Sequence, residues 1–132
     1  MVMMEWNDAL KVGHPQIDRD HQRLVGLINA LGKAMSEGQG QDVCGHILAE
    51  LISYTKTHFA MEERLMSRHR YPDAAAHHAE HARLIQEVEA FQQKFVDGTA
   101  VLSVSLLHFL MDWLGHHILK SDKALAAGIS HE

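Results

Sequence analysis

Hydrophobic residues recur along this chain at steps of three and four, the spacing that gathers side chains on one face of an α-helix. The first run comprises Leu24, Val25, Ile28, Leu31 and Met35. Asp18 precedes it, and an aspartate there can accept hydrogen bonds from the free N–H groups of a first helical turn. Gly38-Gln39-Gly40 ends the run. We therefore expect a first helix that is capped by Asp18 and stops before Gly38.

Three further runs have the same period, and their expected bounds are about 42–66, 73–95 and 100–120. Pro72 separates the second run from the third because proline cannot continue a helix, and Asp73 is placed to cap the third. The Asp97-Gly98-Thr99 segment predicts a turn before the fourth. The chain is therefore expected to form four long helices.

The connections between these predicted helices are short, which makes neighbouring helices antiparallel. No segment alternates between apolar and polar residues with a period of two, so no strand is predicted. Gly13 and Pro15 indicate an irregular N-terminal arm. The expected fold class is all-α, an antiparallel up-down-up-down four-helix bundle, with residues 1–132 forming a single domain.

Composition narrows the class of protein. The net charge of −5 argues against nucleic-acid binding, which needs a basic surface. The most apolar stretch, 101–114, is interrupted by polar residues, so an integral membrane protein is not expected. A single cysteine, Cys44, excludes an internal disulfide and favours a reducing compartment, and the N-terminus lacks a secretory pattern. We expect a cytoplasmic protein, with a monomer slightly favoured.

Seven potential metal ligands are distributed over the four predicted helices. They are His21, His58, Glu62, His77, His81, His117 and Asp122. Imidazole and carboxylate groups together suit iron and similar first-row metals. Seven ligands exceed the roughly four of a tetrahedral zinc site. The count therefore predicts two metal ions.

The spacing of these residues predicts that they point into the bundle. Two of the pairs are four residues apart, so each pair shares one helix face, and that face is the apolar one. A metal centre would compensate the cost of burying their carboxylates. His117 and Asp122 are five apart, a divergence of about 140° on a regular α-helix. Both reach one centre only if the helix is distorted, as by a π-type bulge, or ends before Asp122.

Coordination arithmetic predicts an open position. Two six-coordinate ions offer about twelve positions. The five imidazoles fill five, two bridging carboxylates fill four, and an oxide or hydroxide bridge fills two. One position on one ion stays free, next to apolar side chains, which is suited to a small diatomic ligand.

The chain resembles the hemerythrin family in its single-domain bacterial form. The resemblance runs from Trp6 through GHPQIDRDH at 13–21 to WLGHHILKSD at 113–122, and it fills all seven ligand positions. It implies two non-haem irons with an oxo or hydroxo bridge. One iron would be held by His77, His81 and His117. The other would be held by His21 and His58, with Glu62 and Asp122 bridging the two.

The resemblance also implies a function. Dioxygen would bind reversibly at the two-histidine iron, for transport, storage or supply to an oxygen-consuming enzyme as recipient. The positions that match the family's apolar pocket are Leu24, Phe59, Trp113, Leu114 and Ile118. The chain is accordingly expected to be a binding protein and not an enzyme.

Other uses of such a centre remain as alternatives: a di-iron oxidase or peroxidase, a sensor of O2 or redox state, or a structural zinc or iron-sequestering bundle. Carboxylate-rich di-iron sites use Glu and Glu-x-x-His motifs. Here five neutral imidazoles and two carboxylates stabilise high-valent iron less, which favours binding over oxidation. A sensor would need an output domain, and a structural site would not need an apolar pocket.

The remaining seven histidines are not predicted ligands. His78 and His116 are adjacent to ligands but lie about 100° round the helix, so they are expected at the surface or at a helix boundary. His108 is expected on the outer face.

Overall fold

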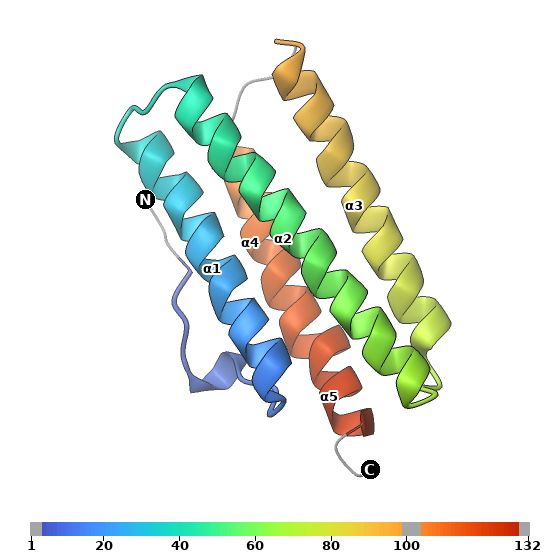
Figure 1. Ribbon diagram of the computed structural model, residues 1–132. Helices are drawn as coiled ribbons and strands as arrows, with labels where there is room; N and C mark the ends of the chain where they lie inside the picture. The colour runs from blue at the N-terminus through green and yellow to red at the C-terminus, as the bar shows by residue number, and fades with distance from the viewer. Residues whose placement is uncertain (1–3, 99–103, 130–132) are drawn as a thin grey trace.

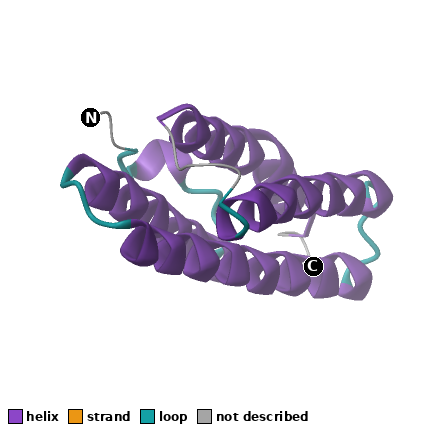
Figure 2. Ribbon diagram, turned by 90° about the horizontal axis from the view of Figure 1, so that it is seen from above, coloured by secondary structure: helices purple, strands orange, loops and turns teal. Residues whose placement is uncertain are grey.

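The computed structural model describes residues 4–98 and 104–129, and in those ranges every regular element is a helix (Figures 1 and 2). The first three rods of the bundle are α1 (Pro15–Ser36), α2 (Gln41–Arg68) and α3 (Ala74–Val96). The fourth consists of α4 (Val104–His116), a π-helical segment η2 (His117–Asp122) and α5 (Lys123–Ile129), joined end to end. Successive rods run in opposite directions, so the predicted antiparallel four-helix bundle is confirmed (Figure 1).

The N-terminal arm is irregular, as predicted, apart from one short 3-10 turn, η1 (Asp8–Leu10). It runs along the outside of α1 (Figure 1). The Asn29 side chain binds it through both of its polar atoms. Its oxygen accepts a hydrogen bond from the Met4 N–H at 2.9 Å, and its amide donates to the Met4 carbonyl at 2.6 Å. Trp6 packs against the apolar core, so the arm is docked on the bundle.

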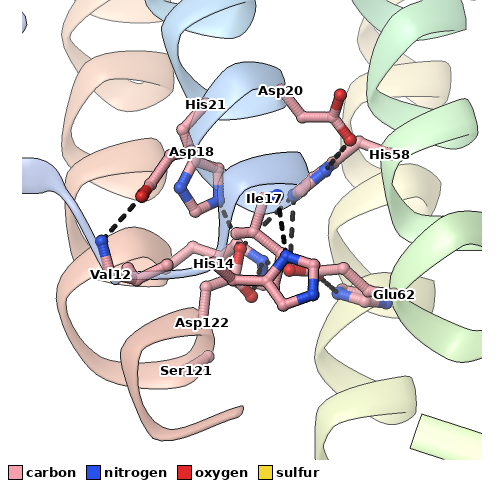
Figure 3. A network of polar contacts seen from close by, with 12 residues as sticks. Val12, His14, Ile17, Asp18, Asp20, His21, His58, Glu62, Ser121 and Asp122 are labelled. Atoms are coloured by element: carbon pink, nitrogen blue, oxygen red, sulfur yellow. Dashed lines mark hydrogen bonds and ion pairs between the residues drawn. The ribbon is translucent and has the colours of Figure 1, made fainter. Parts of the chain in front are cut away.

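The prediction that Asp18 caps the first helix is wrong. The helix begins earlier, at Pro15, and His14 is the cap, because its Nδ1 accepts a hydrogen bond from the Ile17 N–H at 3.3 Å. The Asp18 carboxylate turns back to the arm and accepts from the Val12 N–H at 2.7 Å (Figure 3). Proline at the first helical position requires no N–H partner, which allows the helix to start there.

The predicted end of the first helix and the predicted limits of the second and third hold to within two residues. α1 ends at Ser36, and Gly38 follows in the left-handed region at φ +70°, which glycine adopts without strain. Asp73 occupies the cap position of α3, but its side chain makes no capping hydrogen bond. Thr99 and the expected start of the fourth helix near Ala100 lie outside the described residues. The predicted end of the fourth helix near Lys120 is wrong: the rod continues through η2 and α5 to Ile129, because Leu125 and Ile129 pack into an apolar cluster.

Two apolar clusters fill the bundle interior. The larger one occupies most of its length and includes Leu24, Phe59 and Ile118. The smaller one, at the α5 end, is formed by Ile17, Met66, Leu125 and Ile129. On three of the rods, the predicted ligands lie in the sequence between a residue of the smaller cluster and a residue of the larger one. On α1, for example, His21 lies between Ile17 of the smaller cluster and Leu24 of the larger. The polar site is therefore enclosed by apolar packing at both ends.

The described helices are amphipathic rather than apolar all round. None of them is both long and apolar enough to cross a membrane.

Candidate metal centre

All seven predicted ligands come together in the bundle interior, and each is at most 5% exposed. α1 supplies His21, and α2 supplies His58 and Glu62 one turn apart. The other residues come from the remaining two rods: His77 and His81 from α3, His117 and Asp122 from η2. Such a concentration of buried imidazoles and carboxylates would be costly without mutual pairing or a bound cation.

The π-helical segment brings His117 and Asp122 to one face. They are its first and last residues. Residues five apart diverge on an α-helix, but in a π-helix the backbone hydrogen bond itself joins residues i and i+5, so side chains at that spacing align. The predicted local distortion is therefore present, and both residues are fully buried.

The two carboxylates divide their oxygens between two groups of histidines. Asp122 Oδ2 lies 2.5 Å from His21 Nε2 and 3.3 Å from His58 Nε2. Asp122 Oδ1 lies 3.1 Å from His77 Nε2 and 2.9 Å from His117 Nε2. Asp122 thus faces His21 and His58 with one carboxylate oxygen, and His77 and His117 with the other.

Glu62 repeats this division. Its Oε2 lies 3.4 Å from His58 Nε2, whereas its Oε1 lies 3.3 Å from His77 Nε2 and 3.0 Å from His81 Nε2. His117 Nε2 is 3.5 Å from the same Oε1. The seven residues therefore form two overlapping groups that share Glu62 and Asp122, and each group places its ligand atoms within 4.8 Å of one another.

Ring contacts separate the histidines in the same way. The rings of His21 and His58 are 4.9 Å apart between centroids, edge to face. The three centroid distances among His77, His81 and His117 lie between 4.5 and 5.3 Å. The site is thus a two-histidine half and a three-histidine half with two carboxylates between them.

The donor set fits a bound cation. Glu62 Oε2, Asp122 Oδ1 and His117 Nε2 are buried and have no hydrogen-bond partner among the described residues, although oppositely charged groups lie nearby. Buried polar atoms are nearly always satisfied, so buried polar atoms that gather in the interior without a hydrogen-bond partner fit a site for a cation. Imidazole and carboxylate are the donor types expected for iron.

The carboxylates raise the pKa of three of the buried histidines, His58, His77 and His117, and so favour their charged form. Burial by itself lowers the pKa of His58, but hydrogen bonds to Asp122 and Asp20 outweigh it and raise that pKa to about 9. Against the same effect of burial, Asp122 and Glu62 raise the pKa of His77 to about 9. For Asp122, burial raises the pKa, yet the neighbouring histidines bring it well below its usual range.

Two acidic residues that sequence analysis missed hold the outer nitrogens of predicted ligands. The Nδ1 of His58 donates to Asp20 Oδ2 at 2.9 Å (Figure 3), and the Nδ1 of His117 donates to Glu80 Oε1 at 2.7 Å. The hydrogen bond from His117 lowers the pKa of Glu80 to about 2 against the effect of burial. A third carboxylate, Glu63, lies 3.4 Å from His81 Nδ1.

A signal for the first two acids was present in the sequence. Asp20 directly precedes His21, and Glu80 directly precedes His81. A residue next to a ligand lies about 100° round the helix, which puts its side chain on the flank that a neighbouring helix covers. The signal is weak, because which neighbour covers that flank depends on the packing.

The five predicted pocket residues belong to, or pack against, the larger apolar cluster. Two of them contact predicted ligands. The Phe59 ring stacks on His81 with centroids 3.7 Å apart, and the Trp113 ring stacks on His117 at 5.4 Å. Leu24, Leu114 and Ile118 are fully buried. Leu24 and Trp113 also line a small cavity of about 10 Å³ in the core.

The histidines expected to be outside are outside. His78 and His116, each adjacent to a predicted ligand, are both exposed, and His108 is exposed on α4. His78 pairs with Glu63 at the surface.

Comparisons with known proteins find a cation-binding family and several relatives. Residues 12–127 match the family described as the hemerythrin HHE cation binding domain. The chain is 36% identical to a bacteriohemerythrin of Stenotrophomonas maltophilia over 96% of its length and 81% of the relative's. It is 35% identical to a bacteriohemerythrin of Methylococcus capsulatus over 93% of its length and 94% of the relative's. The crystal structure of a wild-type hemerythrin superposes with a TM-score of 0.92 at 32% identity, covering 98% of this chain and 99% of that one.

Proposed function

The chain belongs to the hemerythrin family, and from this premise we propose that it binds dioxygen reversibly at a di-iron centre held by the seven clustered residues. The observation that carries the proposal is the division of the carboxylate oxygens. Each of Glu62 and Asp122 turns one oxygen to the two-histidine half and the other to the three-histidine half. This is the arrangement that two bridging carboxylates between two ions require.

The ligand assignment follows these halves. His21 and His58 would hold one iron, and His77, His81 and His117 the other. Two irons would supply the electrons that dioxygen takes up when it binds and returns when it leaves. The two-histidine half has fewer protein donors, so it is the half with room for an exogenous ligand.

The protein's own contribution is to orient the ligands and to keep water away. The α-helical and π-helical backbones fix the spacing of the proposed ligands. Phe59 and Trp113 cover the rings of His81 and His117. Leu114, just before η2, and Ile118, within it, are wholly buried. A dry apolar wall strengthens the electrostatic interactions inside it and slows the entry of water and protons.

Five neutral imidazoles and only two carboxylates favour binding over oxidation catalysis, because fewer anionic ligands stabilise high-valent iron less. We therefore propose a carrier, a store or a supplier of O2 to an oxygen-consuming enzyme, and not an enzyme in its own right. The free, buried thiol of Cys44 suits a reducing compartment such as the cytoplasm.

An iron analysis combined with absorbance spectra would test the proposal. The chain is loaded anaerobically with Fe(II), and its spectrum is recorded under argon, in air and again under argon. We expect two irons per chain and charge-transfer bands that appear with O2 and disappear when it is removed. A zinc-loaded sample is the control and should show no such bands.

Two results would contradict the proposal. A single ion per chain would refute the two-metal assignment. Bands that form in air but do not reverse under argon would favour an oxidase or peroxidase instead.

A further inference from the structure

Asp20 and Glu80 form the same arrangement in the two halves of the site. Asp20 accepts from His58 Nδ1 through Oδ2 at 2.9 Å and from the Tyr54 hydroxyl through Oδ1 at 2.9 Å. Glu80 accepts from His117 Nδ1 through Oε1 at 2.7 Å and from the Ser121 hydroxyl through Oε2 at 2.6 Å. In both cases one carboxylate oxygen faces an imidazole and the other faces a hydroxyl.

The sequence positions repeat as well. In each half, the acidic residue directly precedes one predicted metal ligand in the sequence, but it accepts a hydrogen bond from a predicted ligand on a different rod. The hydroxyl comes from the same rod as the histidine that is held, four residues away: Tyr54 before His58, and Ser121 after His117. Each arrangement is thus a hydroxyl–carboxylate–imidazole chain that crosses between two rods and ends at the candidate metal centre.

We propose that Asp20 and Glu80 are positioning residues for the iron centre, one in each half, and that the Tyr54 and Ser121 hydroxyls tune them. The inference rests on the proposed function, because it assigns these groups a role toward the bound irons. A carboxylate can only accept, so the nitrogen facing it must carry the proton. That fixes the tautomer of His58 and His117 in which Nε2 keeps its lone pair for the metal.

The orientation of the rings agrees with this role. With Nδ1 held from outside, His58 Nε2 lies 3.3 Å from Asp122 Oδ2, and His117 Nε2 lies 2.9 Å from Asp122 Oδ1. Both Nε2 atoms therefore point to Asp122, one of the two carboxylates proposed to bridge the irons. A carboxylate beside the outer nitrogen also makes the imidazole a stronger electron-pair donor to a metal, which would favour the oxidised state of a bound iron.

Asp20 and Glu80 differ in how far they are buried, and this difference predicts which of them affects the bound iron more. The Asp20 side chain is 8% exposed, whereas that of Glu80 is 28% exposed. Water screens the charge of Glu80 more, so Asp20 should influence its half of the centre more strongly.

The test replaces each acid by its amide and measures iron affinity and reduction potential. Asp20→Asn and Glu80→Gln keep an oxygen that can accept from Nδ1–H but remove the charge. Anaerobic Fe(II) titration should show an affinity loss of about 10–100-fold, in line with other outer partners of metal-bound histidines. The midpoint potential of the loaded protein should rise, and more for Asp20→Asn. Glu87→Gln, an exposed change of equal charge on α3, is the matched control and should alter neither quantity.

The hydroxyls provide variants that leave every carboxylate and imidazole in place. Tyr54→Phe and Ser121→Ala each remove a donor from the distant carboxylate oxygen, so the acid becomes a stronger acceptor from its histidine. The potential should therefore shift in the opposite direction, downward. A purely structural role would not give opposite signs for the amide and the hydroxyl variants.

The outcomes separate the two proposals. If the parent chain binds no iron, the proposed function fails and the inference fails with it. If the parent binds two irons but all four variants match the parent in potential and affinity, the inference is overturned and the function stands. Potentials that move in the same direction in the amide and hydroxyl variants also overturn it.

Discussion

The interior of this bundle has two unlike parts, built on the same helices. The apolar core, represented by Leu31 and Leu48, is stabilised by the burial of apolar side chains. This stabilisation depends on how well the side-chain volumes fill the interior, and it requires no particular direction of contact. The polar site contains seven of the nine buried polar residues in the described ranges, and these are stabilised by directed contacts between imidazole and carboxylate groups. The same helices thus carry two kinds of buried contact, and a bound ion would act directly on only the polar part.

Loss of one proposed ligand should have the largest effect, and only in the polar part. His117→Ala removes an imidazole that lies near both Glu62 and Asp122, so it should release iron and lower the free energy of unfolding of the metal-free chain by about 3–5 kcal/mol. Iron analysis and chemical denaturation would measure both. His116→Ala, the exposed neighbour, is the control, and an equal loss of iron there would refute the ligand assignment.

A cavity in the apolar part should cost stability without touching iron. Leu31 is fully buried, and Leu31→Ala should lower the free energy of unfolding by about 2–5 kcal/mol. The iron content and the spectrum of the loaded protein should match the parent. Loss of iron would mean that the two parts are not separable.

Alkaline pH should destabilise the metal-free protein but not the iron-loaded one. The pKa values of His58 and His77 are about 9 in the metal-free fold, against an ordinary value of about 6.5. The charged imidazoles therefore stabilise the fold fully below pH 6.5, and this contribution is lost as the pH rises through 9. We expect a gradual loss, smaller than for Leu31→Ala, because neutral imidazoles can still donate to the carboxylates.

Thermal unfolding between pH 6 and 10 would measure this difference. With iron bound the histidines are neutral ligands already, so the loaded protein should be nearly independent of pH over this range. Equal pH dependence in the two forms would show that the histidine pairs with Glu62 and Asp122 contribute little.

A polar group at the border between the two parts should have the smallest effect on structure. Leu114 is fully buried three residues before His117, and Leu114→Asn touches no proposed ligand. Both irons should stay, but the oxygenated spectrum should decay faster, because a polar pocket admits water and protons. Spectra followed over time in air would show it, and an unchanged decay rate would remove Leu114 from the proposed pocket wall.

The fold and the seven clustered residues could be predicted because both are recorded as spacing along single helices. Leu24, Ile28 and Leu31 mark one face whatever the neighbouring helix is, and His58 with Glu62 does the same for the polar site. An irregularity near η2 was predictable as well, since His117 and Asp122 could share a centre only through a distorted helix or a helix that ends before Asp122, and the structure has the distortion.

Features that depend on contacts between segments could not be predicted. Asp18 has the usual chemistry of a helix cap, but the returning arm provides it with Val12 N–H, and His14 caps instead. Asp20 and Glu80 look like ordinary surface acids until the packing places another rod's histidine next to each. Sequence periodicity contains no information about which flank meets which neighbour.

The π-helical segment also determines where this chain can change its length. A codon lost between those for His117 and Asp122 would leave them four residues apart, an ordinary α-helical spacing that still shares one face. Leu119, which is 49% exposed, lies within η2, where the π-helical turn contains one residue more than an α-helical turn would. The same deletion inside α1 or α2 would rotate every later residue of that rod by about 100° and turn ligands away from the centre. Relatives of this chain should therefore tolerate a one-residue gap here and resist it elsewhere in the rods.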